Sequence, residues 1–168
     1  MYRIITVCTG NICRSPMAQY VLTKALAEAG LAARATVDSA GTSNWEAGRP
    51  IDQRAAARLK LAGLPSTGHR ARQFLPAWYR ERDLILALDI DHYEQLRTDA
   101  PDEDSLAKVR MFRSFDPALA DREPAAQGIY DPWFGDSGDF DAAWEMIRAA
   151  LPGLVRHVRQ ASAETSGA

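Results

Sequence analysis

Short apolar runs rich in β-branched residues alternate along this chain with longer segments of helical periodicity. The runs cover residues 3–7 (RIITV), 35–41 (ATVDSAG), 83–89 (DLILALD) and 108–112 (KVRMF). Strands that alternate with helices favour a parallel sheet whose two faces are both covered by helices. The sequence therefore predicts an α/β fold, a three-layer doubly wound sandwich with a four-stranded parallel sheet.

The helices are predicted from apolar periodicity and from residues that favour helix ends. Ser15 suits an N-cap and Pro16 the first turn of a helix that Gly30 would end. Asp52 suits the N-cap of a second helix, which Gly63 would end. Further helices are expected over residues 74–82, 91–97 and 139–160.

Length and patterning indicate one domain over residues 1–160, followed by a flexible tail over 161–168 that lacks apolar periodicity. The net charge of −2 gives no reason to expect a nucleic-acid partner. The chain shows no signal peptide and no apolar run long enough for a membrane span. We expect a cytoplasmic monomer without membrane insertion, and export without a signal peptide stays an open alternative.

The chain has 2 cysteines, Cys8 and Cys13. Two cysteines five positions apart make neither a disulfide framework nor a four-ligand zinc site. We therefore expect a reducing compartment, no metal and no cofactor.

Both cysteines lie in the loop VCTGNICRSP, between the first predicted strand and the first predicted helix. Backbone N–H groups and the helix dipole favour an anion at such a position. Gly10 and Asn11 tolerate the curled backbone that an anion nest needs, and Arg14 offers a planar fork for two phosphate oxygens. The loop is therefore predicted to bind phosphate.

Cys8 is the candidate nucleophile of this loop. A helix N-terminus and a neighbouring cation favour the thiolate form of a cysteine, and Ser15 can donate a hydrogen bond to its sulfur. The alternative is a small buried cysteine in a strand-to-helix turn, with Arg14 on the surface. The agreement of Gly, Asn, Arg, Ser and Pro with the phosphate geometry favours attack by Cys8 on phosphorus.

VCTGNICRSPMA resembles the signature of the low molecular weight protein tyrosine phosphatase family: Cys, five residues, Arg, then Ser-Pro. The resemblance covers residues 3–158. It implies a flavodoxin-like sheet with strand order 2-1-3-4, and hydrolysis of protein phosphotyrosine through a phosphocysteine on Cys8, with phosphate or vanadate as active-site anions. Further segments similar to the family in the same order are SAGTSNW (39–45), DQRAAARL (52–59), HRARQF (69–74), DLILALD (83–89) and YDPWFGDSGDF (130–140).

The resemblance also implies residue roles. Arg14 would bind the phosphate, and Asp131 would act as general acid and then as general base. Four residues would hold the loop by hydrogen bonds: Asn11, Ser15, Ser39 and His69. No role is assigned to His92 or His157. The phosphate-binding loop itself would comprise Cys8, Thr9, Gly10, Asn11, Ile12, Cys13, Arg14 and Ser15.

The general acid has two sequence candidates, because Asp-Pro occurs at Asp116 and at Asp131. An Asp-Pro pair often only begins a turn. The aromatic residues Tyr130, Trp133 and Phe134 would give Asp131 an apolar setting, which favours a protonated carboxyl. This setting and the resemblance favour Asp131.

An apolar crevice above the loop would suit a phosphotyrosine ring. Ile12, Trp45, Trp133 and Phe134 are the expected walls, and ordinary packing is the less favoured alternative for the two tryptophans. Family members that act on phosphoarginine carry Thr at the position of Ile12, so Ile12 favours phosphotyrosine. Many relatives carry paired tyrosines where this chain has Trp133-Phe134, which argues against regulation by tyrosine phosphorylation at those positions.

Cys13 is a redox candidate, since a reversible disulfide with Cys8 would protect the nucleophile from deeper oxidation. The alternative is a small buried filler.

Basic residues concentrate in the middle third of the chain, where they indicate a solvated surface or a surface that steers acidic phosphoproteins. They are Arg49, Arg54, Arg58, Lys60, Arg70, Arg72, Arg80 and Arg82.

Two other functions stay open. An arsenate reductase of the same fold would need further cysteines beyond Cys13, and none follows; a non-catalytic phosphate-binding module would not need Asp131.

Overall fold

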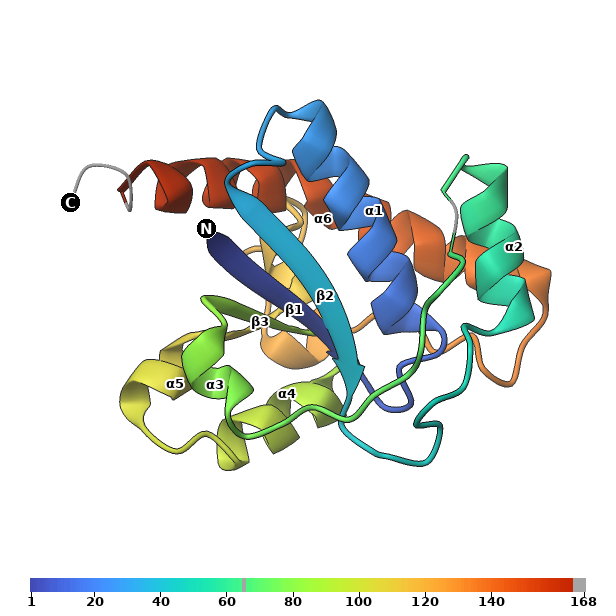
Figure 1. Ribbon diagram of the computed structural model, residues 1–168, viewed down its shortest axis with the longest axis horizontal. Helices are drawn as coiled ribbons and strands as arrows, with labels where there is room; N and C mark the ends of the chain where they lie inside the picture. Colours follow the sequence, from blue (N-terminus) through green and yellow to red (C-terminus); the bar gives the residue numbers. More distant parts are fainter. Residues whose placement is uncertain (65, 165–168) are drawn as a thin grey trace.

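The computed structural model describes residues 1–64 and 66–164. Its centre is one parallel sheet with the strand order β2-β1-β3-β4 (Figure 1). This confirms the predicted α/β fold and the order 2-1-3-4. The strands are β1 (Tyr2–Cys8), β2 (Ala35–Gly41), β3 (Leu84–Ala87) and β4 (Val109–Met111).

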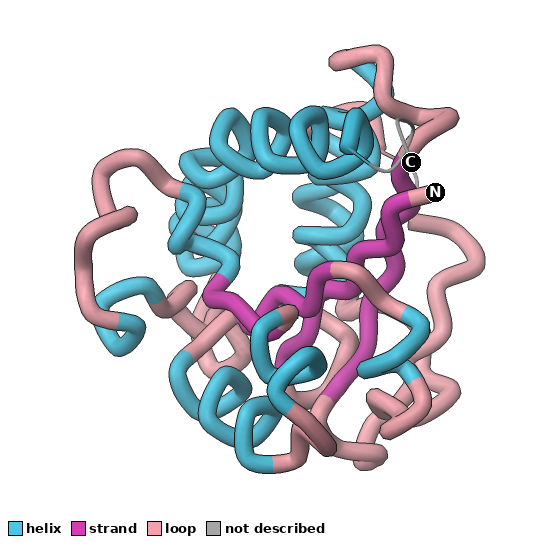
Figure 2. The backbone as a smooth tube through the Cα atoms, turned by 90° about the vertical axis from the view of Figure 1, so that its left-hand side faces the viewer, coloured by secondary structure: helices cyan, strands magenta, loops and turns pink. Residues whose placement is uncertain are grey.

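Helices cover both faces of the sheet, as Figure 2 shows. Alternate strand residues point to opposite faces: Ile4 and Leu84 join one apolar core, and Ile5 and Ile85 join the other. The first core is closed by α1 (Arg14–Glu28), α2 (Gln53–Leu61) and α6 (Ser137–Glu164). The other side carries α3 (Trp78–Glu81), α4 (Ile90–Thr98) and α5 (Glu103–Ala107), and the 3₁₀ helices are η1 (Phe112–Phe115) and η2 (Pro124–Gln127).

The central position of β1 decides where a ligand can bind. β2 pairs with one side of β1 and β3 with the other, so the connections that leave β1 and β3 diverge at their carboxyl ends. Cys8 lies opposite Gly41 of β2, and Val7 lies opposite Ala87 of β3. Open parallel sheets bind ligands at such a switch point, and the loop after Cys8 begins there.

The start of α1 differs from the prediction. The helix begins at Arg14 with Cys13 at the N-cap, and no side chain caps it. Ser15 is therefore not the cap; its hydroxyl lies within hydrogen-bond distance of Cys8 Sγ and of the carbonyl of Ala40. The predicted end is confirmed, since α1 stops just before Gly30, which has a φ of 74°.

Asp52 caps α2 as predicted, accepting a hydrogen bond from the Arg54 amide at 2.8 Å. The short elements were harder to predict. Only Trp78–Glu81 of the predicted helix 74–82 is helical. α5 was not predicted, although Asp102 caps it through the Ser105 amide at 2.8 Å.

The last helix is longer than predicted. α6 begins at Ser137 and continues through Pro152 to Glu164, so residues 161–164 extend the helix and the prediction of a tail from 161 is wrong there. The rest of the predicted tail, 165–168, lies outside the described residues. In the described parts of the chain, no helix has both the length and the apolar character of a membrane span.

Candidate active site

The loop between β1 and α1 curls at the carboxyl edge of the sheet. Asn11 has a φ of 57° and is the one non-glycine residue with positive φ among residues 1–64 and 66–164. A Cβ at Gly41, the last residue of β2, would lie 2.4 Å from the carbonyl oxygen of Thr9. Only glycine therefore lets the neighbouring strand pass this close to the loop.

Cys8 lies at the base of the loop and is 4% exposed. Its sulfur is 3.0 Å from Ser15 Oγ. That hydroxyl accepts a hydrogen bond from Asn11 Nδ2 at 2.9 Å, so its own proton is available for the sulfur or for the carbonyl of Ala40 at 3.2 Å. Ser15 can therefore stabilise a negative sulfur.

Asn11 is the buttress of the loop. Its Nδ2 also donates to Ser39 Oγ at 2.9 Å, and its Oδ1 accepts from the Arg72 amide at 3.0 Å. Its backbone carbonyl accepts from His69 Nε2 at 2.7 Å, so the His69 ring proton is on Nε2. Burial lowers the pKa of His69, which keeps it neutral in this role. The structure thus brings together the four residues predicted to hold the loop.

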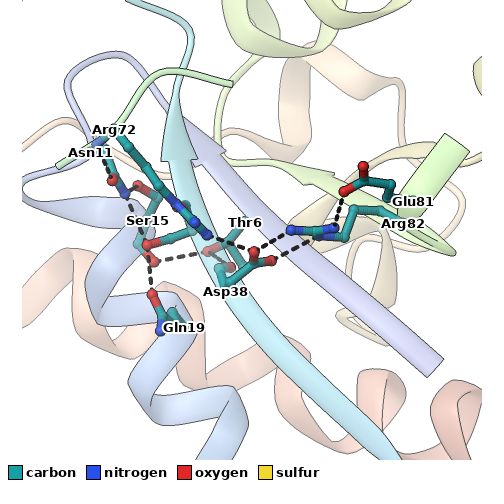
Figure 3. A network of polar contacts seen from close by, with 9 residues as sticks. Thr6, Asn11, Ser15, Gln19, Asp38, Arg72, Glu81 and Arg82 are labelled. Carbon is teal, nitrogen blue, oxygen red and sulfur yellow. Dashed lines mark hydrogen bonds and ion pairs between the residues drawn. The ribbon is translucent and has the colours of Figure 1, made fainter. Parts of the chain in front are cut away.

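The hydrogen-bond network around Asn11 continues through Arg72 to the sheet, as Figure 3 shows. The Arg72 and Arg82 guanidinium groups both bind Asp38 Oδ2 at 2.6 Å. Trp78 lies under both, with its ring centre 4.6 Å from Arg72 Cζ and 5.2 Å from Arg82 Cζ. The segment that supports Asn11 is therefore fixed to β2 by a paired carboxylate and stacked cations.

Arg14 is 3% exposed, and each of its terminal nitrogens has an acceptor. Nη2 donates to Asp131 Oδ2 at 2.6 Å. Nη1 donates to Asp89 Oδ2 at 3.2 Å and to the carbonyl of Ile129 at 3.0 Å. The residues predicted as phosphate ligand and general acid therefore touch each other, although 117 positions separate them.

Asp116, the other Asp-Pro candidate, has structural contacts instead. It is 5% exposed, pairs with Arg113 at 3.2 Å and accepts from the Ala118 amide at 3.0 Å. The structure therefore favours Asp131 as the carboxylate of this site.

A pocket of about 270 Å³ opens above the loop, and all four expected wall residues line it. Ile12 is buried, whereas Trp45 is 79% and Phe134 is 96% exposed. Of the three aromatic residues predicted to give Asp131 an apolar setting, Tyr130 is 51%, Trp133 38% and Phe134 96% exposed. The Asp131 side chain is itself 46% exposed, so these side chains do not bury its carboxyl. The pocket is lined by Cys8, Thr9, Gly10, Ile12, Cys13, Arg14, Trp45, Glu46, Asp131, Trp133 and Phe134.

Arg54 ties the segment that follows Asp131 to α2. Its Nη1 donates to the carbonyl of Gly135 at 2.7 Å and its Nη2 to the carbonyl of Trp133 at 3.1 Å. Asp52 orients the guanidinium through Oδ2 at 3.0 Å. This arginine, predicted only as one of a basic run, holds one wall of the pocket.

Cys13 is buried, and both cysteines are free thiols. Burial is the main cause that raises the pKa of the Cys13 thiol, and the nearby Asp52 carboxylate adds to it. Cys13 is therefore a thiol at neutral pH. Within the described chain, no group of three or more His, Cys, Asp or Glu residues is placed to hold a metal ion.

Sequence reasoning missed Asp89 and His92. Asp89 lies two residues after the end of β3 and thus at the same edge of the sheet as Cys8. The end of a parallel strand beside the loop was the signal that could have found it. His92 is 3% exposed, and its Nε2 lies 2.8 Å from Thr9 Oγ1. Nothing in the local sequence marks that contact, because 83 positions separate the two residues.

The family model described as "Low molecular weight phosphotyrosine protein phosphatase" matches residues 3–164. The chain belongs to this family. A Streptomyces coelicolor "Low molecular weight protein-tyrosine-phosphatase" is 43% identical over 159 residues, covering 95% of this chain and 94% of that protein. The match confirms the resemblance found in the signature loop.

Solved structures agree with the assignment. A protein tyrosine phosphatase from Entamoeba histolytica superposes with a TM-score of 0.87 at 25% identity, covering 96% of this chain and 99% of that one. Vibrio vulnificus Wzb, solved in complex with benzylphosphonate, has a TM-score of 0.77 at 28% identity, covering 93% of this chain and 98% of that one.

Proposed function

We propose that this phosphatase hydrolyses protein phosphotyrosine, with Cys8 as nucleophile, Arg14 as phosphate ligand and Asp131 as general acid and base. The observation that carries the proposal is one pocket with a cysteine sulfur at its base and an arginine–aspartate pair beside it. The sulfur has a hydroxyl donor 3.0 Å away, and α1 begins at the loop. These are the groups that stabilise a thiolate and a bound phosphate.

In the first step, the Cys8 thiolate attacks phosphorus and the bond from phosphorus to the tyrosine oxygen breaks. The proton of the Asp131 carboxylic acid moves to the departing oxygen, which leaves as a neutral phenol. Arg14 Nη2 now donates to Asp131, so substrate must take over this donor. Phosphate binding thereby releases the Asp131 carboxyl toward the leaving group.

In the second step, water attacks the phosphocysteine. Asp131, now a carboxylate, accepts a proton from that water as its oxygen bonds to phosphorus. The sulfur–phosphorus bond breaks, the electron pair returns to the Cys8 thiolate, and inorganic phosphate leaves. Arg14 and the loop amides stabilise the charge on the transferred phosphoryl group in both steps.

The walls of the pocket support a phosphotyrosine substrate. Ile12 lies at the base, while Trp45 and Phe134 stand exposed at the rim, where they can contact a phenyl ring and the peptide around it. The similar Wzb structure holds benzylphosphonate, a benzyl group on a phosphonate. The same anion site would accept inorganic phosphate and vanadate.

We also infer that the enzyme works as a monomer. It would work in a reducing compartment such as the cytoplasm, because the mechanism needs Cys8 without a disulfide. Oxidation is the corresponding threat. Cys13 lines the same pocket as Cys8 and would serve as its disulfide partner, which mass spectrometry after mild peroxide would detect. Irreversible oxidation of Cys8 without that disulfide would contradict the protective role.

Hydrolysis of para-nitrophenyl phosphate in the presence of a chelator tests the function. We expect turnover that vanadate inhibits and that Cys8→Ser abolishes, with a phosphorylated Cys8 trapped by rapid acid quench. Arsenate-dependent consumption of a thiol reductant without phosphate release would indicate a reductase. Phosphate binding with no hydrolysis would indicate a binding module. Full activity in Cys8→Ser would disprove the mechanism.

A further inference from the structure

His92 is a buried histidine next to the nucleophile loop. It lies in the first turn of α4 and is 3% exposed, and its Nε2 is 2.8 Å from Thr9 Oγ1. Thr9 follows Cys8 in the chain and lines the pocket. The other ring nitrogen, Nδ1, is buried without a hydrogen-bond partner in the described structure.

The unpartnered Nδ1 decides where the ring proton is. A neutral imidazole has one N–H and one bare nitrogen. A proton on Nδ1 would be a buried donor without an acceptor, which folded proteins tolerate less often than a buried acceptor without a donor. A proton on Nε2 is donated to Thr9 Oγ1, and Nδ1 is then only a bare acceptor. We therefore assign the Nε2–H tautomer to His92.

The charges around His92 favour the neutral ring. Arg14 of α1 faces it, together with Asp89 at the N-cap of α4, Asp91 in α4 and Asp131 of the segment before α6. Burial is the largest effect and lowers the pKa of His92, and the positive charge of Arg14 lowers it further. The three carboxylates raise the pKa, but the net result is a pKa of about 4. The imidazole is therefore neutral at neutral pH.

If Nε2–H is the donor, the proton of the Thr9 hydroxyl is left for another acceptor. The His92 contact is the one hydrogen bond of Thr9 Oγ1 recorded within residues 1–64 and 66–164. Because Thr9 lines the pocket directly after Cys8, a phosphate bound above the sulfur is the acceptor in reach. A hydroxyl that has accepted one hydrogen bond is also polarised as a donor.

We propose that His92 is a positioning residue of the phosphatase reaction, which holds Thr9 so that its hydroxyl donates to an oxygen of the bound phosphoryl group. This rests on the proposed function and adds a side-chain donor to Arg14 and the loop amides. A hydrogen bond to a charged group is worth about 1.5–3 kcal/mol. Its loss would lower kcat/KM by roughly 10- to 100-fold.

A set of four variants tests the pair, with kcat and KM measured on para-nitrophenyl phosphate. Thr9→Val removes the hydroxyl and keeps the shape. His92→Asn places its amide near the position of Nδ1, whereas His92→Gln can place its amide nitrogen near Nε2. We expect Thr9→Val and His92→Asn to lose activity equally, their double variant to lose no more than either, and His92→Gln to recover most of it.

His157→Gln is the matched control. This histidine bonds Tyr2 at 3.0 Å, at the opposite end of β1 from Cys8, so its replacement should leave kcat/KM unchanged. Independent losses in Thr9→Val and His92→Asn, or an unaltered Thr9→Val, would overturn the proposal. So would ¹⁵N chemical shifts that place the His92 proton on Nδ1.

Binding of inorganic phosphate separates this proposal from the proposed function. In a Cys8→Ser background no turnover is needed, and calorimetry should show weaker phosphate binding when Thr9→Val or His92→Asn is added. Weaker phosphate binding in these variants, together with no hydrolysis by the chain that retains Cys8, would uphold the pair and reject the phosphatase. Hydrolysis with unchanged phosphate binding in all variants would do the reverse.

Discussion

At the scale of single residues, Arg14 and Asp131 bind each other, although the proposed mechanism needs both groups for the substrate. Arg14 is buried and needs acceptors for its donors, and Asp131 supplies one at 2.6 Å. The same Nη2 would bind a phosphate oxygen in the proposed mechanism. The Asp131 carboxylate therefore occupies a donor that substrate needs, so phosphate affinity and acid catalysis oppose each other at this residue.

Replacement of Asp131 should reveal both effects. Asp131→Ala should lower kcat for phosphotyrosine about 10²- to 10⁴-fold, because the leaving oxygen then departs without a proton. It should also tighten inhibition by inorganic phosphate, because Arg14 is freed. Steady-state kinetics with phosphate as inhibitor measures both. Asp116→Ala is the control: it removes a buried pair with Arg113 and should reduce stability while leaving kcat unchanged. The opposite pattern would reassign the acid.

At the scale of elements, the segment that carries Asp131 depends on a helix far from it in sequence. Arg54 of α2 donates to the carbonyls of Trp133 and Gly135, and a fork of two donors is needed to reach both. Its guanidinium also lies 4.7 Å from the ring centre of Phe140 in α6. The helix thus fixes the position of the acid relative to the loop.

Arg54→Lys should separate charge from geometry. The substitution keeps the cation and removes the fork, so we expect kcat for phosphotyrosine to fall about 3- to 10-fold as Asp131 loses its fixed position. A para-nitrophenyl leaving group needs less proton transfer and should be affected less. Arg58→Lys, on the same helix and paired with Asp141, should change neither rate. Equal losses on both substrates would show that Arg54 does not act through the acid.

The comparison of sequence and structure separates local from tertiary information. The strands, the loop from Cys8 to Ser15 and the Asp52 cap were predictable, because apolar runs and capping residues are local signals. Asp89 could have been found from its place just after a predicted strand, but His92 and the role of Arg54 could not, since each acts through a partner far along the chain. Basic residues usually lie in solvent, so the number of basic residues in the sequence could not show that Arg54 binds the backbone carbonyls beside the pocket.

Gly153 shows the same limit within a helix. A Cβ there would lie 2.0 Å from the carbonyl oxygen of Phe115, so glycine lets α6 approach η1 closely. Local preference disfavours glycine in a helix interior. Sequence periodicity alone could therefore place α6, but could not show which residue sets its distance from η1.

At the scale of the whole molecule, buried neutral histidines link stability to pH. His92 has a pKa of about 4 in the folded chain against 6.5 as the ordinary value. Between these values the unfolded chain binds more protons, so the free energy of unfolding falls as pH falls from 6.5 toward 4. His69, whose pKa is also lowered by burial, acts in the same direction.

Urea denaturation at pH 7 and pH 4 measures this linkage. The wild-type chain should lose on the order of 3 kcal/mol from His92 across that interval. His92→Gln has no such proton and should lose less by about that amount. Parallel pH dependence in the two proteins would mean that His92 is not buried as a neutral ring.

The order of the functional groups along the chain has a consequence for biosynthesis. The Cys8 sulfur is at position 8, the residues that support its loop are at positions 39, 69 and 72, and the proposed acid is at position 131. A nascent chain on the ribosome therefore exposes its reactive thiol long before any of these partners has been translated. In the proposed mechanism, dephosphorylation can begin only after the segment that carries Asp131 has been translated, and until then the cysteine depends on cellular reductants for protection.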